Sequence, residues 1–155
     1  MLIRLFEPLD ADSLATLFHA SVHEAGIRDY SAEQVWAWSP SKPDPQRYLQ
    51  QAQDRTILVA IDNDGRPVGY GNLEPDGHMD HLYCRPDMIG VGVGLGICAA
   101  IETVARKAGI KLLFVEASEG ARRLFERRGF ILEARNEFAI NGVMIHDYRM
   151  SKWIA

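Results

Sequence analysis

The sequence predicts a single α+β domain built on a mixed, mostly antiparallel sheet of about six or seven strands, with helices on both faces. Three observations predict this fold. Strand-like segments joined by tight turns fill residues 56–84. An amphipathic helix pattern follows a glycine-rich loop at 85–96, and another helix pattern lies between the strand-like segments near the C-terminus. The length of 155 residues suits one domain, 1–155, with a substantial core.

The composition is ordinary for a globular protein, with 47% apolar and 25% charged residues. A net charge of −4 gives no reason to expect a nucleic-acid partner. No run approaches the roughly 18 apolar residues of a membrane span, and residues 1–7 lack a signal-peptide pattern. Cys84 and Cys98 lie in apolar runs, which fits free thiols in a reducing compartment. We therefore expect a cytoplasmic protein without a membrane partner.

The N-terminal third predicts one strand and three helices. Residues 2–6 form the strand, and Asp10 is placed to cap the first helix. Two shorter helical stretches, 31–38 and 45–53, flank a proline-rich loop. The apolar face of the first helix repeats every three or four residues and comprises Leu14, Leu17, Phe18, Ser21, Val22 and Ala25.

The middle of the chain predicts a meander of three antiparallel strands. The runs 56–61 and 68–73 are rich in β-branched and apolar residues and flank Asn63-Asp64-Gly65, a typical hairpin turn. Pro75-Asp76-Gly77 then leads into a third strand at 78–84.

A helix connects this meander to the next strand. An apolar stripe from 97 to 108 predicts an amphipathic helix that stops at Gly109, and residues 111–117 predict the strand. Because a helix crosses between strands 78–84 and 111–117, we expect these two strands to run parallel.

The C-terminal part predicts a helix followed by a long hairpin. Ser118 is placed to cap a helix that extends to about Arg128. Strands 130–139 and 143–150 then flank Asn141-Gly142. A long closing hairpin offers an edge at which two copies could form a homodimer.

The most informative segment is the loop Arg85–Gly96, where glycines alternate with apolar residues between a strand and a helix. Glycine permits positive φ and lets a ligand approach the backbone. Amide groups at the start of a helix also point outward beside the positive end of the helix dipole. The loop therefore predicts an anion site, with a phosphate as the usual occupant.

Two common phosphate loops do not fit this segment. A P-loop would end in Gly-Lys-Ser/Thr, which is absent. The dinucleotide fingerprint G-x-G-x-x-G fails from Gly90, where the sixth position is Leu95, and from Gly92, where it is Ile97. A glycine-rich turn without a ligand is the remaining alternative, although glycine is unfavourable in a helix.

The loop resembles the phosphate motif of the GNAT superfamily of acetyl-CoA-dependent N-acetyltransferases. The match comprises Ile89–Gly94 with the lead-in Leu82–Asp87, and Ala121–Phe130 resembles a second family motif. The predicted element order also agrees over nearly the whole chain. Trp36–Trp38 and Asp76–Tyr83, with Glu116-Ala117-Ser118, look like a group of uncharacterised bacterial single-domain members. The resemblance implies the GNAT fold, in which the parallel strand pair splays apart.

The resemblance also implies acetyl-CoA as cosubstrate and names its contacts. The pantetheine arm would lie along the strand edge at Leu82, Tyr83 and Cys84, where it pairs as an added strand does. Phe125 stands where many members carry a tyrosine that faces the thiol. Backbone amides would hold the pyrophosphate at Ile89, Gly90, Val91, Gly92, Val93, Gly94 and Leu95.

Two positions depart from the family pattern. Ile89 replaces the usual Gln or Arg, so its main-chain N–H is the group that can contribute. Phe125 cannot donate a proton to the departing thiolate. Because a thiol of pKa about 8.5 leaves readily, we expect departure without a general acid.

Candidates for the amine side lie on the predicted strand 78–84. An attacking amine must lose a proton, so we expect a nearby base, with Asp80 as the first candidate and His78 as the second. Asp80 could instead anchor a cationic acceptor, or both could be solvated or paired surface residues. Glu74 and Glu116, at strand ends, are further candidates.

No metal site is expected in this segment. His78 and His81 are three residues apart, so on a strand they point to opposite faces and cannot converge on one ion. The sequence therefore predicts a reaction without a metal.

Aromatic and basic side chains elsewhere are open to two interpretations. Trp36 and Trp38 could form an aromatic wall of the acceptor pocket or pack the helix pair. The CoA 3′-phosphate could be reached by Arg122, Arg123, Arg127 and Arg128. Because a run of charges on a helix is usually solvated, only Arg122 or Arg123 is favoured. Cys84 is not expected to carry the acetyl group, because no activating partner is near it in the sequence.

The sequence thus predicts an enzyme that moves an acetyl group from acetyl-CoA to a primary amine of a small molecule or peptide by direct attack. The alternative is a GNAT-like domain that binds acyl-CoA without turning it over. Ile89 and Phe125 are the residues that favour this alternative.

Overall fold

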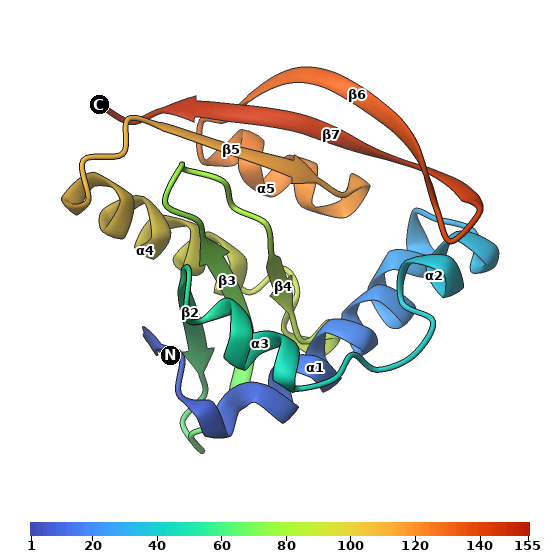
Figure 1. Ribbon diagram of the computed structural model, residues 1–155, viewed down its shortest axis with the longest axis horizontal. Coiled ribbons are helices and arrows are strands. Elements are labelled where there is room, and N and C mark those ends of the chain that lie inside the picture. Colours follow the sequence, from blue (N-terminus) through green and yellow to red (C-terminus); the bar gives the residue numbers. More distant parts are fainter.

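The computed structural model describes residues 1–155, and its strands form two antiparallel sheets that meet at one point (Figure 1). One sheet has the order β1-β2-β3-β4 and the other β5-β7-β6. A single parallel bridge between His78 and Phe114 joins them. Beyond that bridge β4 and β5 separate, which confirms the predicted mixed sheet with a splayed parallel pair. The strands are β1 Leu2–Leu5, β2 Thr56–Ile61, β3 Pro67–Leu73, β4 Leu82–Cys84, β5 Leu112–Ala117, β6 Ile131–Ile140 and β7 Val143–Trp153.

Helices cover both faces of the strands, as predicted. Side chains of β2 alternate between two apolar clusters, with Leu58 and Ala60 on the α4 side and Ile57 and Val59 on the α1 side. Figure 1 shows α4 and α5 on the opposite side of the strands from α1 and α3. The helices are α1 Ala11–Ala20, α2 Ala32–Trp38, α3 Gln46–Gln51, α4 Val93–Lys107 and α5 Glu119–Arg127.

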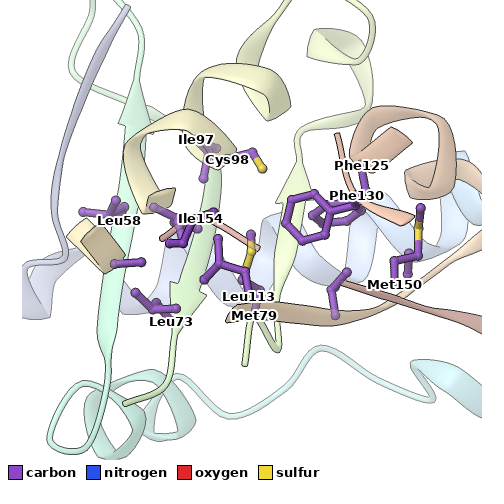
Figure 2. Close-up of a cluster of buried hydrophobic side chains, with 14 of the residues drawn as sticks. Leu58, Leu73, Met79, Ile97, Cys98, Leu113, Phe125, Phe130, Met150 and Ile154 are labelled. Atoms are coloured by element: carbon purple, nitrogen blue, oxygen red, sulfur yellow. The ribbon is translucent and has the colours of Figure 1, made fainter. Parts of the chain in front are cut away.

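The larger apolar cluster fixes the start of α4 against the sheet (Figure 2). Ile97 is fully buried in it and packs over Gly69 and Gly71 of β3. A Cβ on Gly69 would lie 2.8 Å from Val93 and 2.9 Å from Ile97, so only glycine allows this close approach. The glycine loop before α4 is thereby held at the end of β4.

The first helix differs from its prediction in two ways. The regular helix α1 ends at Ala20 and continues as a π-helical turn, Ser21–Ala25, and a 3-10 turn, Gly26–Arg28. The Asp10 carboxylate does not cap the helix. It accepts hydrogen bonds from the Arg4 guanidinium at 2.8 and 3.0 Å and from the Glu7 N–H, because the preceding chain turns back toward it.

The strand predicted at 78–84 is shorter in the structure and consists only of β4. The N–H groups of Asp80 and His81 donate to the side-chain oxygen of Asn72, each at 3.0 Å, while Met79 N–H donates to the Phe114 carbonyl. The chain therefore crosses from β5 to β3 between residues 79 and 81. The strand geometry on which His78 and His81 were expected to point to opposite faces therefore does not extend across this crossing.

The predicted cap and the predicted C-terminal turn are confirmed. Ser118 caps α5 through its side chain, and Ser31, which was not predicted as a cap, caps α2 in the same way. Asn141 and Gly142 both have positive φ, 47° and 78°, as the hairpin between β6 and β7 requires. Strand β6 lies at the outer edge of its sheet. None of the helices is long and apolar enough to cross a membrane.

Candidate active site

A cavity of about 510 Å³ opens where β4 and β5 separate. Its lining combines segments that are far apart in sequence and is rich in apolar side chains. The lining residues come from segments 21–30, 82–84, 88–95 and 118–127, together with Trp38.

The glycine loop forms one end of this cavity and offers unpaired amide groups. Gly90 and Gly92 have φ of 84° and 95°, which favours glycine strongly over other residues. Gly92 is the N-cap of α4 and supplies no side-chain acceptor. The amides of Val93, Gly94 and Leu95, in the first turn of α4, consequently have no partner within the helix. This geometry suits an anion such as a phosphate.

Gly94 serves a different purpose in the same loop, since it allows α5 to approach. A Cβ on Gly94 would lie 2.4 Å from Leu124 Cδ1 and 3.6 Å from the Cys84 sulfur. The contact brings the loop, β4 and α5 together at one wall of the cavity. A side chain at this position would force α5 away.

Two arginines of α5 add positive charge to the wall of the cavity. Arg123 and Arg127 are one helical turn apart, line the cavity and form no ion pair. Arg122 instead donates to Glu126 at 3.0 Å and lies over the Tyr148 ring. Of the two arginines favoured from the sequence, Arg123 is therefore the one that faces the cavity.

Strand β4 presents an open edge to the cavity, because it is the outer strand of its sheet and pairs only with β3. Leu82 and Cys84 pack toward the α4 cluster, whereas Tyr83 packs toward α1, with its ring 4.8 Å from that of Phe18. Burial raises the pKa of the Cys84 thiol to about 11. The thiol is therefore protonated near neutral pH, which disfavours a nucleophilic role.

Most of the residues predicted to contact the cofactor line this cavity. Val91 and Val93 do not: Val91 is 64% exposed and Val93 is buried in the core, so each could contribute only its main chain. The predicted residues that line the cavity are Leu82, Tyr83, Cys84, Ile89, Gly90, Gly92, Gly94 and Leu95.

Phe125 lies in the core rather than in the cavity wall, in contrast to the sequence expectation. Its side chain is 1% exposed and packs against Phe130 at 5.0 Å between ring centroids (Figure 2). Ala121 and Leu124, on the neighbouring face of α5, line the cavity instead. The helix turns position 125 toward the sheet, where a large apolar ring is well accommodated.

His78 lies outside the cavity lining and is held between two carboxylates. Its Nδ1 lies 2.9 Å from Glu74 and its Nε2 lies 2.5 Å from Glu116, and its ring stacks on Phe114. Burial alone would lower the pKa of His78, but the hydrogen bonds and charges of Glu116 and Glu74 outweigh burial and raise it. An imidazolium that donates from both nitrogens has no lone pair to accept a proton. This geometry counts against His78 as a general base.

Asp80 belongs to the same cluster and also lies outside the cavity lining. Arg55 Nη1 lies 3.3 Å from the Asp80 carboxylate and 3.5 Å from Glu74. Oxygen and nitrogen atoms of Glu74, His78 and Asp80 lie within 4.8 Å of one another, a spacing that a metal ion could use. Arg55 and the His78 imidazolium already supply the positive charge that these carboxylates need.

His81 is buried in a network with Arg47 and Tyr70, and its Nε2 lies 3.8 Å from the Asp80 carboxylate. Arg47 can only donate, so its hydrogen bond of 2.9 Å to Nε2 leaves the proton of the neutral ring on Nδ1, which donates to Tyr70. The Tyr70 hydroxyl in turn lies 3.0 Å from that of Tyr48. Burial and the charge of Arg47 lower the pKa of His81 to about 4. His81 is therefore neutral near pH 7.

Tyr30 is a site residue that the sequence did not reveal. It lines the cavity, donates its hydroxyl proton to the His146 carbonyl at 3.0 Å and accepts the Glu119 N–H at 2.9 Å. Burial raises its pKa to about 12. These partners are 116 and 89 residues away in sequence, so no local pattern could have identified them.

The two tryptophans of α2 have different surroundings. Trp38 lines the cavity, with its ring 5.6 Å from Tyr30 and 6.2 Å from Tyr83. Trp36 is 57% exposed and packs against His23 on the outside of the helix pair. Only Trp38 could form the aromatic wall considered from the sequence.

Comparison with known proteins finds the same architecture elsewhere. A family model described as Acetyltransferase (GNAT) domain matches residues 27–152. The crystal structure "GCN5-Related N-acetyltransferase: Aminotransferase, Class-II" from Rhodopseudomonas palustris is 35% identical in sequence. It matches with a TM-score of 0.89 over 98% of this chain and 94% of that chain.

Two further relatives are more distant. The uncharacterized N-acetyltransferase YafP of Escherichia coli (strain K12) is 26% identical over 149 residues, which cover 96% of this chain and 93% of YafP. The structure of YncA from Salmonella typhimurium, with its cofactor acetyl-CoA, is 18% identical and has a TM-score of 0.77. That match covers 100% of this chain and 94% of YncA, and it shows a shared fold.

Proposed function

The chain belongs to the GNAT acetyltransferase family, and from this premise we propose that it transfers an acetyl group from acetyl-CoA directly to a primary amine of a small molecule or peptide. One observation carries the proposal. The cavity between the splayed strands has unpaired amides of the glycine loop at one end and aromatic rings elsewhere in its lining. This combination fits a ligand with a charged phosphate end and an extended, less polar arm.

The residues present fit acetyl-CoA along the whole cavity. The amides of Val93, Gly94 and Leu95 would hold the pyrophosphate at the start of α4. The open edge of β4 would pair with the peptide-like pantetheine arm. Arg123 and Arg127 would bind the 3′-phosphate through their guanidinium groups.

When bound, acetyl-CoA would supply a thioester whose acetyl carbon the amine attacks. We assign Asp80 to the acceptor side, as a base or as an ionic anchor for a cationic amine. Asp80 lies two residues before Leu82, which lines the cavity, and its side chain is 39% exposed. His78, as an imidazolium, would donate a hydrogen bond to each of Glu74 and Glu116, and it would not act as a base.

No side chain is needed to protonate the departing thiolate in this mechanism. Phe125 lies in the core and cannot donate a proton. A thiol with a pKa of about 8.5 is a good leaving group near neutral pH.

The proposal is tested by two measurements on the full chain. Calorimetric titration with acetyl-CoA measures binding, and release of free thiol in the presence of a panel of primary amines measures transfer. We expect saturable binding and amine-dependent thiol release for at least one acceptor class. An absence of binding would contradict the proposal. Binding without thiol release for every amine would favour the alternative of an acyl-CoA sensor, which Ile89 and Phe125 suggest.

The role of Asp80 has its own test. We expect Asp80→Asn to lower kcat or to raise the acceptor KM by at least about tenfold while acetyl-CoA binding is retained. Asp64→Asn, in the turn between β2 and β3, is the matched control and should change neither value. Unchanged turnover and unchanged acceptor KM in Asp80→Asn would remove Asp80 from the mechanism.

A further inference from the structure

Ser21 is a polar residue at a position where the surrounding pattern calls for an apolar one. It follows Leu14, Leu17 and Phe18 on the apolar face of the first helix, and it is 9% exposed. It lines the cavity beside Val22, and its hydroxyl has no hydrogen-bond partner within the protein but is accessible from the cavity. A hydroxyl that is open to the cavity and free of protein partners can hydrogen-bond to a ligand that enters the cavity.

The backbone around Ser21 is also unusual. Regular α-helix stops at Ala20, and Ser21 begins a π-helical turn that ends at Ala25. A serine within a helix often donates to the carbonyl four residues earlier, but the Ser21 hydroxyl does not bond to Leu17. Single π-turns within helices occur frequently at functional sites. The turn places Ser21, Val22 and Ala25 together in the cavity wall.

We propose that the Ser21 hydroxyl hydrogen-bonds to an amide group of the pantetheine arm of acetyl-CoA, an inference that rests on the proposed cofactor cavity. The arm carries two amides. The edge of β4 can pair only with the amide N–H and C=O groups of the arm that face it, so those on the other side need another partner. A hydroxyl suits either kind of group, because it can donate to a carbonyl or accept from an N–H.

The position of Ser21 favours the arm over the acceptor amine. The π-helical turn packs against the turn Pro86–Met88, which directly precedes the glycine loop. The two sheets meet at the other end of this region, at His78 and Phe114. Ser21 therefore lies toward the phosphate end of β4, where the middle of the arm would pass.

Two ligands distinguish a contact with the pantetheine arm from a contact with the nucleotide part of CoA. In Ser21→Ala we expect the Kd for CoA to rise about 3- to 10-fold, the loss typical of one hydrogen bond. The Kd for 3′-phosphoadenosine 5′-diphosphate, which lacks the arm, should not change. Because alanine removes an unpaired hydroxyl and favours helix, the melting temperature of the free variant should be equal or higher.

Ser13→Ala is the matched control, since Ser13 is exposed on α1 and does not line this cavity. It should leave both Kd values unchanged. An unchanged Kd for CoA in Ser21→Ala, or an equal loss for both ligands, would overturn the inference. A rise in the acceptor KM at unchanged CoA affinity would overturn it in favour of an acceptor contact. A wild-type chain that binds neither ligand would overturn the proposed function and this inference with it.

Discussion

At the scale of single residues, the partners of a side chain decide which chemistry it can perform. From the sequence, His78 has a suitable ordinary pKa for a base, and only its position between Glu74 and Glu116 shows that both nitrogens donate. His81 is the opposite case, because Arg47 and burial hold it neutral. Two histidines three residues apart thus have pKa values shifted in opposite directions.

The raised pKa of His78 predicts a specific pH dependence of stability. A histidine whose folded-state pKa is raised contributes stability that is complete below its ordinary pKa of 6.5 and is lost as pH rises through the folded-state pKa. The charges that stabilise the imidazolium are those of Glu74, Glu116 and Asp80. We therefore expect the difference in unfolding free energy between wild type and His78→Gln to be larger at about pH 6 than at about pH 9. Urea unfolding at both pH values measures it, and an equal difference would contradict the prediction.

Glu102 is a fully buried carboxylate that accepts hydrogen bonds from two cations and lies 3.7 Å from a third, Arg106, and it predicts a large loss of stability on substitution. Arg128 Nε donates to it at 2.8 Å and Lys152 Nζ at 2.5 Å. Glu102→Gln leaves these cations without a counter-charge, and we expect a loss of about 2–3 kcal/mol in unfolding free energy. Glu126→Gln removes only the exposed pair with Arg122, which solvent screens, and should cost much less stability. Equal losses of unfolding free energy for the two variants in urea would contradict this prediction.

At the scale of elements, α4 and its loop combine two different uses of glycine. Gly90 and Gly92 have positive φ and open space around them, whereas Gly94 has an ordinary φ and no room for a side chain. The alternating spacing in the sequence indicated a phosphate loop without distinguishing these uses. The distinction depends on where α5 packs.

Gly92 provides a test of the loop as a ligand-binding element. In Gly92→Ala we expect a loss of about 1–2 kcal/mol in stability, because φ of 95° is strained for alanine. We also expect the Kd for CoA to rise at least about tenfold, because relief of that strain moves the amides at the start of α4.

Gly65→Ala is the matched control for this prediction. Gly65 has φ of 77° and equally open space, but it lies in the turn between β2 and β3, away from the cavity lining. It should lose similar stability in urea unfolding and retain the wild-type Kd for CoA in calorimetry. A similar loss of affinity in both variants would show that strain alone, and not the loop, controls binding.

At the scale of the whole molecule, the cavity exists only because distant segments are joined around it. Tyr30 links the segment after α1 to α5 and β7 through two hydrogen bonds. Beside this contact, a hydrogen bond of 2.6 Å between His146 Nε2 and the Glu119 carboxylate also joins β7 to α5. This junction holds the two sheets in a fixed relation on the side where β4 and β5 separate.

Tyr30→Phe tests whether this junction shapes the site. The variant leaves Glu119 N–H without its acceptor, and we expect a loss of about 1–2 kcal/mol in stability. We also expect kcat/KM for thiol release to fall about tenfold, because the cavity wall is no longer held in position. Tyr48→Phe breaks a buried hydroxyl pair outside the cavity lining and should lose similar stability with unchanged kcat/KM. Equal activity in the two variants would assign Tyr30 a purely structural role.

The sequence by itself determined the order of the elements, the meander, the Ser118 cap and the glycine loop. These features depend on local chemistry: apolar spacing, turn residues and capping side chains act within a few residues of one another. The family resemblance rested on the same local motifs, and for that reason the cavity contains most of the residues predicted around Gly90–Gly94.

Only the tertiary structure decided which side chains face one another across the cavity. It shortened β4, because the Asn72 side chain and Phe114 hold residues 79–81 away from strand geometry. In the structure, Phe125 lies in the core, and Tyr30 lies in the wall of the cavity. These outcomes depend on contacts between segments far apart in the chain, and such contacts leave no periodic pattern in the sequence.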